Sequence, residues 1–103
     1  MNSTPSNGYE LHFFSKDACR FCRYAKPIYE KEIRPVFQMN GIPCYEYDTA
    51  TPSGQLKRME FNVRTVPTLI LIDSKRREIF RGDSTTIRNS LKVLSELTLD
   101  DSF

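Results

Sequence analysis

A run of five consecutive apolar and β-branched residues, 68–72 (TLILI), constrains the fold of this chain more than any other part of its sequence. Continuous apolar runs of this length are typical of a strand that is buried on both faces of a sheet. The sequence therefore predicts that residues 68–72 form a central strand. With 103 residues, the chain is one domain and is too short to enclose two cores.

Alternating strand and helix patterns surround this central strand. Residues 9–14 and 43–47 are rich in aromatic and apolar residues and predict two more strands. Residues 78–81 predict a fourth, which forms a hairpin with the central strand across a polar turn at 73–77. Helical patterns separate and follow these strands, giving the order β-α-β-α-β-β-α. This order indicates an α/β fold with a central mixed sheet of about four strands, flanked by helices.

The first helical pattern begins at Phe21 and ends at the Asn40-Gly41 pair, which suits a helix C-cap. Pro27 and Pro35 lie inside this pattern. Because proline lacks an amide hydrogen, we expect Pro27 to kink the helix and Pro35 to break or bend it again. Apolar residues recur at three- and four-residue spacing and predict one buried stripe: Ala25, Ile28, Tyr29, Ile33 and Phe37.

Two further helices are expected. Thr51 is well placed as an N-cap, with Pro52 at the first helical position. The apolar side of this helix is predicted to consist of Leu56, Met59 and Phe61. Asp83 or Ser84 is a candidate cap for the last helix. The inward-facing residues of the last helix are predicted to be Ile87, Leu91, Leu94 and Leu97.

The ends of the chain and its net charge indicate where the protein acts and which partners it lacks. Residues 1–8 are expected to be a flexible leader, residues 9–98 the folded domain, and residues 99–103 an acidic tail. Neither an export signal nor an apolar segment of membrane-spanning length is evident, so we expect a cytoplasmic protein without membrane contacts. We also expect it to be a monomer. The net charge of +2 lacks the basic excess that is typical of nucleic-acid binding.

The three cysteines do not suggest a disulfide-stabilised scaffold. Cys19 and Cys22 form a C-x-x-C pair, which in a reducing compartment is a redox pair or half of a metal site. Zinc normally takes four ligands, and no second C-x-x-C or H-x-x-x-H is present. Cys44 and His12 both fall in predicted strands, where a single cysteine or histidine is usually a packed or surface residue. The redox pair is therefore favoured.

The C-x-x-C pair falls where the loop after the first strand enters the first helix. Unpaired amide hydrogens and the positive end of the helix dipole favour a thiolate there, and Arg20 and Arg23 add positive charge. We therefore predict that Cys19 is the exposed nucleophilic thiol. Cys22 lies nearly one turn later, within disulfide reach but shielded, as suits a resolving thiol. Together with Lys26, the two arginines could attract an acidic segment of a partner.

Three features together resemble the thioredoxin superfamily. The C-x-x-C pair opens a helix after a strand, and Pro27 follows its second cysteine by five residues. Residues 64–68 (RTVPT) precede the apolar strand and are similar to the family's cis-proline loop. Gly82 follows the hairpin strand, where thioredoxins have a glycine beside the site. The likeness extends from about residue 9 to residue 97.

The resemblance implies a thioredoxin-like fold with a binding surface for an extended substrate beside the cysteines. Pro67 would follow a cis peptide bond and pack beside the cysteine pair, and Val66 would offer its backbone to the substrate. Thr65 and Gly82 would complete this surface.

The sequence also departs from the thioredoxin pattern. Phe13 stands where thioredoxins bury an aspartate below the cysteines, and Cys44 is expected in place of the lysine that accompanies that aspartate.

The cysteines and the resemblance together predict a dithiol-disulfide oxidoreductase of thioredoxin type, which reduces protein disulfides through a mixed disulfide. The redox-active pair is Cys19–Cys22, and no metal or organic cofactor is expected. The expected partners are disulfide-containing proteins and an electron donor, either a reductase or glutathione. Two alternatives stay open: a glutaredoxin that uses glutathione as reductant, and a non-catalytic subunit of a larger enzyme.

Overall fold

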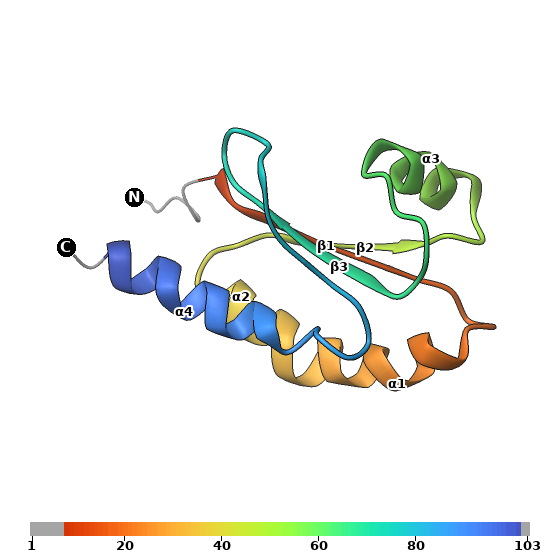
Figure 1. Cartoon of the computed structure of the whole chain (residues 1–103), viewed down its shortest axis with the longest axis horizontal. Coiled ribbons are helices and arrows are strands. Elements are labelled where there is room, and N and C mark those ends of the chain that lie inside the picture. The colour runs from red at the N-terminus through yellow and green to blue at the C-terminus, as the bar shows by residue number, and fades with distance from the viewer. Residues whose placement is uncertain (1–7, 102–103) are drawn as a thin grey trace.

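Strands and helices alternate along the chain in the order expected from the sequence (Figure 1). The computed structural model describes residues 8–101, so the expected leader lies almost entirely outside the described residues. The strands are β1 (Glu10–Ser15), β2 (Cys44–Asp48), β3 (Thr68–Ile72) and β4 (Glu78–Gly82). The helices are α1 (Arg20–Ile28), α2 (Arg34–Met39), α3 (Pro52–Glu60) and α4 (Asn89–Asp101).

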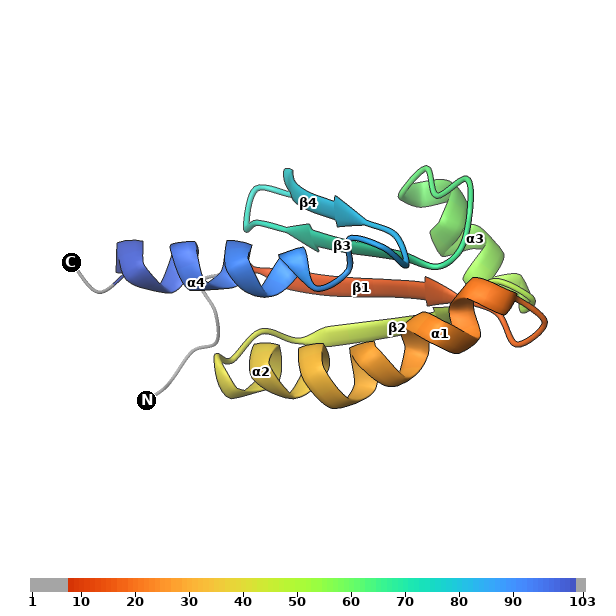
Figure 2. The same ribbon diagram turned by 60° about the horizontal axis from the view of Figure 1, so that its bottom comes forward.

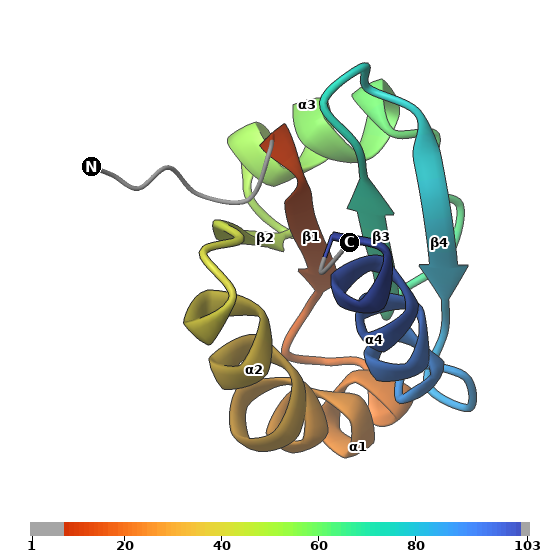
Figure 3. The ribbon, with the colours of Figure 1, turned by 90° about the vertical axis from the view of Figure 1, so that its left-hand side faces the viewer.

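The strands form one mixed sheet in the order β2-β1-β3-β4. β1 and β2 are parallel, whereas β3 is antiparallel to both β1 and β4. Helices α1, α2 and α4 cover one face of the sheet and α3 lies over the other (Figure 3). Every residue of β3 is buried, as its apolar run predicts. The predicted α/β class, the single domain and the mixed four-stranded sheet are confirmed.

A π-helical turn, Tyr29–Ile33, joins α1 to α2 without an intervening loop (Figure 2). In this turn the amide of Arg34 donates to the carbonyl of Tyr29, five residues earlier. Pro35 follows the π-turn directly, as the second residue of α2. Of the expected break or bend at Pro35, the break is wrong, because the helical backbone continues from Arg20 to Met39.

The π-turn also explains how the apolar stripe stays on one face. Four-residue spacing drifts by about 40° per step around an α-helix of 3.6 residues per turn. One wider turn absorbs part of this drift, because it holds an additional residue. All the stripe residues are accordingly buried: Ala25, Ile28, Tyr29, Ile33 and Phe37.

The end of α2 matches its prediction. Asn40 is the C-cap, and Gly41 follows with a positive φ of 74°. The amide of Gly41 donates to the Gln38 carbonyl and that of Ile42 to the Phe37 carbonyl, each at 3.0 Å. These bonds satisfy carbonyls that have no partner within the helix, and the left-handed conformation that they require favours glycine.

Helix α3 begins as predicted but is oriented differently. The Thr51 hydroxyl accepts a hydrogen bond from the Gly54 amide at 3.0 Å, and Pro52 occupies the first turn. The expected burial of Leu56 and Met59 is wrong, because their side chains are 69% and 70% exposed. The inner face instead carries residues 54, 57, 58 and 61, which recur at helical spacing and are buried or partly buried.

Helix α4 begins later than its candidate caps. Asp83 instead closes a turn, since its carboxylate accepts from the amides of Thr85 at 2.9 Å and Thr86 at 3.2 Å. Neither Asp83 nor Ser84 is therefore the N-cap of α4, which starts at Asn89. The helix extends to Asp101, into the segment expected to be a tail, and residues 102–103 lie outside the described residues. None of the described helices is long and apolar enough to cross a membrane.

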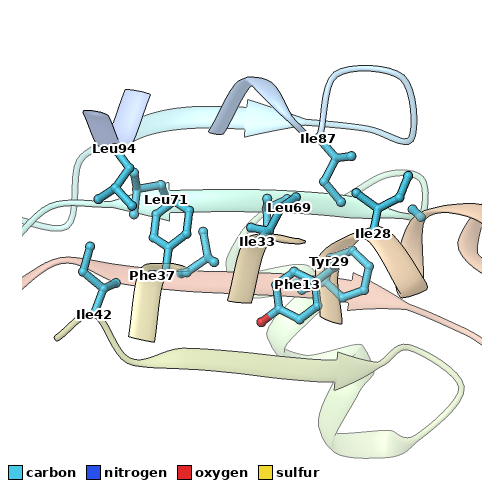
Figure 4. Close-up of a cluster of buried hydrophobic side chains, with 12 residues drawn as sticks. Phe13, Ile28, Tyr29, Ile33, Phe37, Ile42, Leu69, Leu71, Ile87 and Leu94 are labelled. Atoms are coloured by element: carbon cyan, nitrogen blue, oxygen red, sulfur yellow. The ribbon is translucent and has the colours of Figure 1, made fainter. Parts of the chain in front are cut away.

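The main core lies between the sheet and the helices α1, α2 and α4 (Figure 4). The rings of Phe13 and Tyr29 stack there with centroids 4.2 Å apart. Ile87 and Leu94 are buried in this core, and Leu91 and Leu97 pack against it, as predicted for the last helix. A smaller cluster under α3 contains Phe14, Val63, Ile70 and Ile72, with Phe61 packed against it.

Candidate active site

Cys19 occupies the N-cap of α1. Its backbone is extended, with φ −101° and ψ 121°, and its sulfur accepts a hydrogen bond from the Cys22 amide at 3.1 Å. The first amides of a helix have no partner within the helix, and they lie at the positive end of its dipole. A sulfur in this position is stabilised when it carries negative charge. The predicted placement of Cys19 is confirmed.

Cys22 is shielded where Cys19 is not. Its side chain is only 2% exposed, whereas that of Cys19 is partly open to solvent. Burial, together with a hydrogen bond to Cys19, raises the pKa of Cys22 to about 11. The described geometry therefore contains one accessible thiol at a helix start and one buried thiol behind it, as the sequence predicts.

The loop before β3 lies against the cysteines. Cys19 Sγ is 3.5 Å from the carbonyl oxygen of Val66, to which the thiol donates. The Val66–Pro67 peptide bond is cis, as the resemblance implied. Pro67 is buried, and the Thr68 hydroxyl donates to the Thr65 carbonyl at 2.6 Å, which closes the loop. The structure thus brings Val66 to the Cys19 sulfur from 47 positions further along the chain.

A groove of about 600 Å³ opens beside Cys19. It is lined by Lys16, Cys19, Thr49, Ala50, Gln55, Arg58, Arg64, Thr65 and Val66. Of the residues predicted to bind substrate, Val66 and Thr65 therefore share a groove with Cys19. Gly82 does not, since it lines a second groove of about 640 Å³ that reaches Thr65 from the other side.

Three basic residues of the first groove were missed by the sequence analysis. Lys16 lies in the loop before Cys19, and Arg64 stands next to Thr65, so their closeness in the chain to site residues was an available signal. Arg58 had no such signal, because its place in the groove depends on the orientation of α3. The predicted cations Arg20 and Arg23 are exposed on the first turns of α1, and their effect on Cys19 stays a prediction.

Cys44 lies at the start of β2, and its expected place as the counterpart of the thioredoxin lysine stays a prediction. The β1–β2 register pairs Cys44 with Leu11 and places Glu46 across from Phe13. The Cys44 thiol donates to the Ile42 carbonyl at 3.5 Å, and burial raises its pKa to about 11. Cys44 is a packed residue away from the groove.

His12 is buried on the α3 side of the sheet. Its ring nitrogens lie 2.8 Å from the Tyr47 hydroxyl and 2.9 Å from a Glu10 carboxylate oxygen. Burial lowers the pKa of His12, although Glu10 opposes this effect. Among the side chains of residues 8–97, no group of three or more His, Cys, Asp or Glu is arranged to hold a metal ion.

The sequence matches no protein-family model and no curated protein. The structure is similar to that of a Malassezia sympodialis thioredoxin, with 18% identity over 86% of this chain and 76% of that one, and a TM-score of 0.66. Fasciola hepatica thioredoxin gives 17% identity over 84% and 80% of the two chains, with a TM-score of 0.64. Spinach chloroplast thioredoxin f gives 14% identity over 87% and 70%, with a TM-score of 0.68.

Proposed function

We propose that this chain, which has the thioredoxin fold, is a thiol-disulfide oxidoreductase that reduces protein disulfides through Cys19 and Cys22. One observation carries the proposal. An accessible sulfur at the start of α1 accepts a backbone hydrogen bond, and a buried second thiol lies one turn behind it. This asymmetry suits an attacking and a resolving thiol.

The reaction proceeds in two exchanges. The Cys19 thiolate attacks one sulfur of the substrate disulfide, and the other substrate sulfur leaves as a thiolate that takes up a proton. Cys22 then loses its proton and attacks Cys19 Sγ, which releases the second substrate thiolate. The substrate gains two electrons, and the chain is left with a Cys19–Cys22 disulfide.

The high pKa of Cys22 helps to order these exchanges. At neutral pH its thiol is protonated and does not compete with Cys19 for the substrate. One cause of this high pKa is the hydrogen bond between Cys22 and Cys19. Formation of the mixed disulfide changes that bond, because Cys19 Sγ is then joined to the substrate. The change makes Cys22 easier to ionise when it is needed.

Insulin reduction by catalytic amounts of the protein tests this function. Electrons are supplied by thioredoxin reductase with NADPH in one series, and by glutathione with glutathione reductase in the other. Cys19→Ser is expected to abolish turnover, and Cys44→Ser, as the control, to retain it. Turnover with glutathione alone would favour the glutaredoxin alternative.

A trapping experiment separates the two roles. Cys22→Ser should accumulate a mixed disulfide with the substrate, visible on a non-reducing gel, because nothing resolves it. The same adduct should not form with Cys19→Ser. If the double variant Cys19→Ser, Cys22→Ser keeps the biological role of the chain, the fold acts as a binding subunit and the proposed reaction is wrong.

A further inference from the structure

Arginines are divided unevenly between paired and unpaired positions. Five of the nine form ion pairs with carboxylates: Arg34, Arg76, Arg77, Arg81 and Arg88. The other four form no ion pair with any carboxylate of residues 8–97, the part of the chain whose side chains the structure describes: Arg20, Arg23, Arg58 and Arg64. The paired arginines lie along the sheet, the hairpin and the outer helix surfaces. The unpaired ones lie on α1, on α3 and in the loop between α3 and β3, which meet near Cys19.

Two of the unpaired arginines line the groove beside the reactive sulfur. Arg58 and Arg64 share it with Lys16, which also has no ion pair among the described residues, and its lining contains no Asp or Glu. Acidic side chains line two neighbouring cavities instead: Asp17, Glu46 and Asp48 in the one that shares Lys16, and Glu78 and Asp83 in the one that shares Arg64 and Thr65. The groove is therefore a concave site of one charge sign next to Cys19.

A groove lined by like charges attracts the opposite charge for two reasons. First, its cations repel one another, and a bound carboxylate reduces this repulsion. Second, the walls of the groove concentrate the electric field of the cations at its opening, which raises the rate of encounter with acidic molecules. The net charge of only +2 shows that this attraction is local and not a property of the whole surface.

We propose that this groove selects disulfide substrates that are acidic protein segments, with at least one Asp or Glu within a few residues of the cysteine that Cys19 attacks. This inference rests on the proposed function, since a ligand that reacts at Cys19 must carry a disulfide. A protein segment suits the groove because the Val66 backbone borders it and can pair with an extended chain. Lys16, Arg58 and Arg64 are then the residues that determine specificity.

Matched peptides test the proposal without an external electron donor. Three cyclic disulfide peptides differ only in the residues next to their cysteines, which are Glu, Gln or Lys. The pre-reduced protein is mixed with each, and the single-turnover rate is measured at 20 and 200 mM NaCl. The Glu peptide should react at least about fivefold faster than the Lys peptide at low salt. This ratio should shrink at high salt, because ions screen exposed charges.

Substitutions in the groove test which residues cause the preference for acidic peptides. Arg58→Gln and Arg64→Gln should each reduce the Glu-to-Lys rate ratio by about two- to fivefold. Lys75→Gln is the matched control, since it also removes one unpaired cation but lies in the β3–β4 turn, at the opposite end of the sheet from Cys19. Its ratio should equal that of the wild type. The proposal would be overturned if the Glu-to-Lys rate ratio of Arg58→Gln equalled that of Lys75→Gln, or if the wild type reduced the three peptides at equal rates.

Two further substrates separate the possible failures. Hydroxyethyl disulfide is uncharged, so its reduction by the wild type together with equal peptide rates would leave the proposed function standing and remove only the acidic preference. No reduction of any disulfide would refute the proposed function itself. If the two arginine substitutions slow glutathione disulfide as much as the Glu peptide, the groove recognises a small peptide and the choice of a protein segment is wrong.

Discussion

The sulfur atom of Cys19 is both the cap of α1 and the proposed nucleophile. N-caps are usually Ser, Thr, Asp or Asn, whose side-chain oxygen accepts a hydrogen bond from an amide of the first turn. Here the sulfur of Cys19 accepts that bond from the Cys22 amide. The sulfur that caps α1 is thus also the sulfur that we propose as the nucleophile. A substitution at Cys19 therefore changes the helix cap and the proposed nucleophile together.

Limiting alkylation at pH 7 should therefore modify one cysteine before the others. The pKa values of Cys22 and Cys44 are both raised to about 11, so both thiols stay protonated. Iodoacetamide at one equivalent should label Cys19 first, as read out by peptide mass spectrometry. Cys19→Ser is the control and should react at least about tenfold more slowly overall. Label found first on Cys22 or Cys44 would contradict the assignment of the nucleophile.

At the scale of elements, α3 is held by a close approach of backbones. A Cβ atom on Gly54 would lie 1.8 Å from the carbonyl oxygen of Asp48, at the end of β2. Helix propensity alone favours alanine over glycine by about 0.8–1.0 kcal/mol. The structure reverses that preference, because the helix cannot accommodate a methyl group without moving away from the sheet.

Gly54→Ala should consequently lower the free energy of unfolding by about 1–3 kcal/mol, as expected for an overpacked site. Urea unfolding followed by circular dichroism measures the change. Ser53→Ala is the control on the same helix, since Ser53 is exposed, and it should stay within about 0.5 kcal/mol of the wild type. A Gly54→Ala protein as stable as the wild type would show that α3 is not held in this way.

The elements that were predicted best are those that the core determines. The run in β3 and the stripe on α1 and α2 are buried as expected, because only one face or one layer can accept them. Sequence patterns failed where burial is set by a contact distant in the chain. Leu56 and Met59 have helical spacing, yet the approach at Gly54 turns the other side of α3 toward the sheet.

Local hydrogen bonding explains two other differences. Asp83 resembles a helix cap in the sequence, but its carboxylate is already used by the turn at Thr85 and Thr86. The π-turn lies between the two prolines and keeps the four-residue stripe on one face, and periodicity counted on an α-helix does not predict it. For the site, the cysteines and the Val66 loop were predictable, whereas the groove cation on α3 was not.

Across the whole molecule, buried ionisable groups define a pH range of maximum stability. On the acidic side, burial lowers the pKa of His12, so the unfolded chain binds a proton more readily than the folded one. Stability is then present above the unfolded pKa of about 6.5 and is lost as the pH falls below it. Carboxylates with lowered pKa values, such as Asp73 and Asp83, act only near pH 4 and below.

On the alkaline side, the raised pKa values of Cys22 and Cys44 favour the protonated folded form. Their contribution is complete below the unfolded thiol pKa of about 8.5 and is lost as the pH rises toward 11. Urea midpoints of the reduced protein should be highest between about pH 7 and 8.5. The slope on either side should not exceed about 1.4 kcal/mol per pH unit for each group.

Two substitutions assign these slopes. His12→Gln should flatten the stability change between pH 5 and 7, and Cys44→Ser should reduce the loss between pH 9 and 11. Lys92→Gln, at an exposed position of α4, serves as the control for both and should leave the profile unchanged. A profile of the wild type that is flat from pH 5 to 7 would contradict the role given to His12.

The contact between Cys19 and Val66 links two events at the site: the ionisation of the thiol and the release of the Val66 carbonyl. A protonated thiol gives its hydrogen to the Val66 carbonyl, 3.5 Å away, whereas a thiolate has no hydrogen to give and repels the oxygen. Ionisation therefore vacates this backbone acceptor at the moment when the sulfur becomes able to attack. Under the proposed function, the departure of a single proton prepares Cys19 for attack and frees the Val66 carbonyl for the amide of an arriving chain.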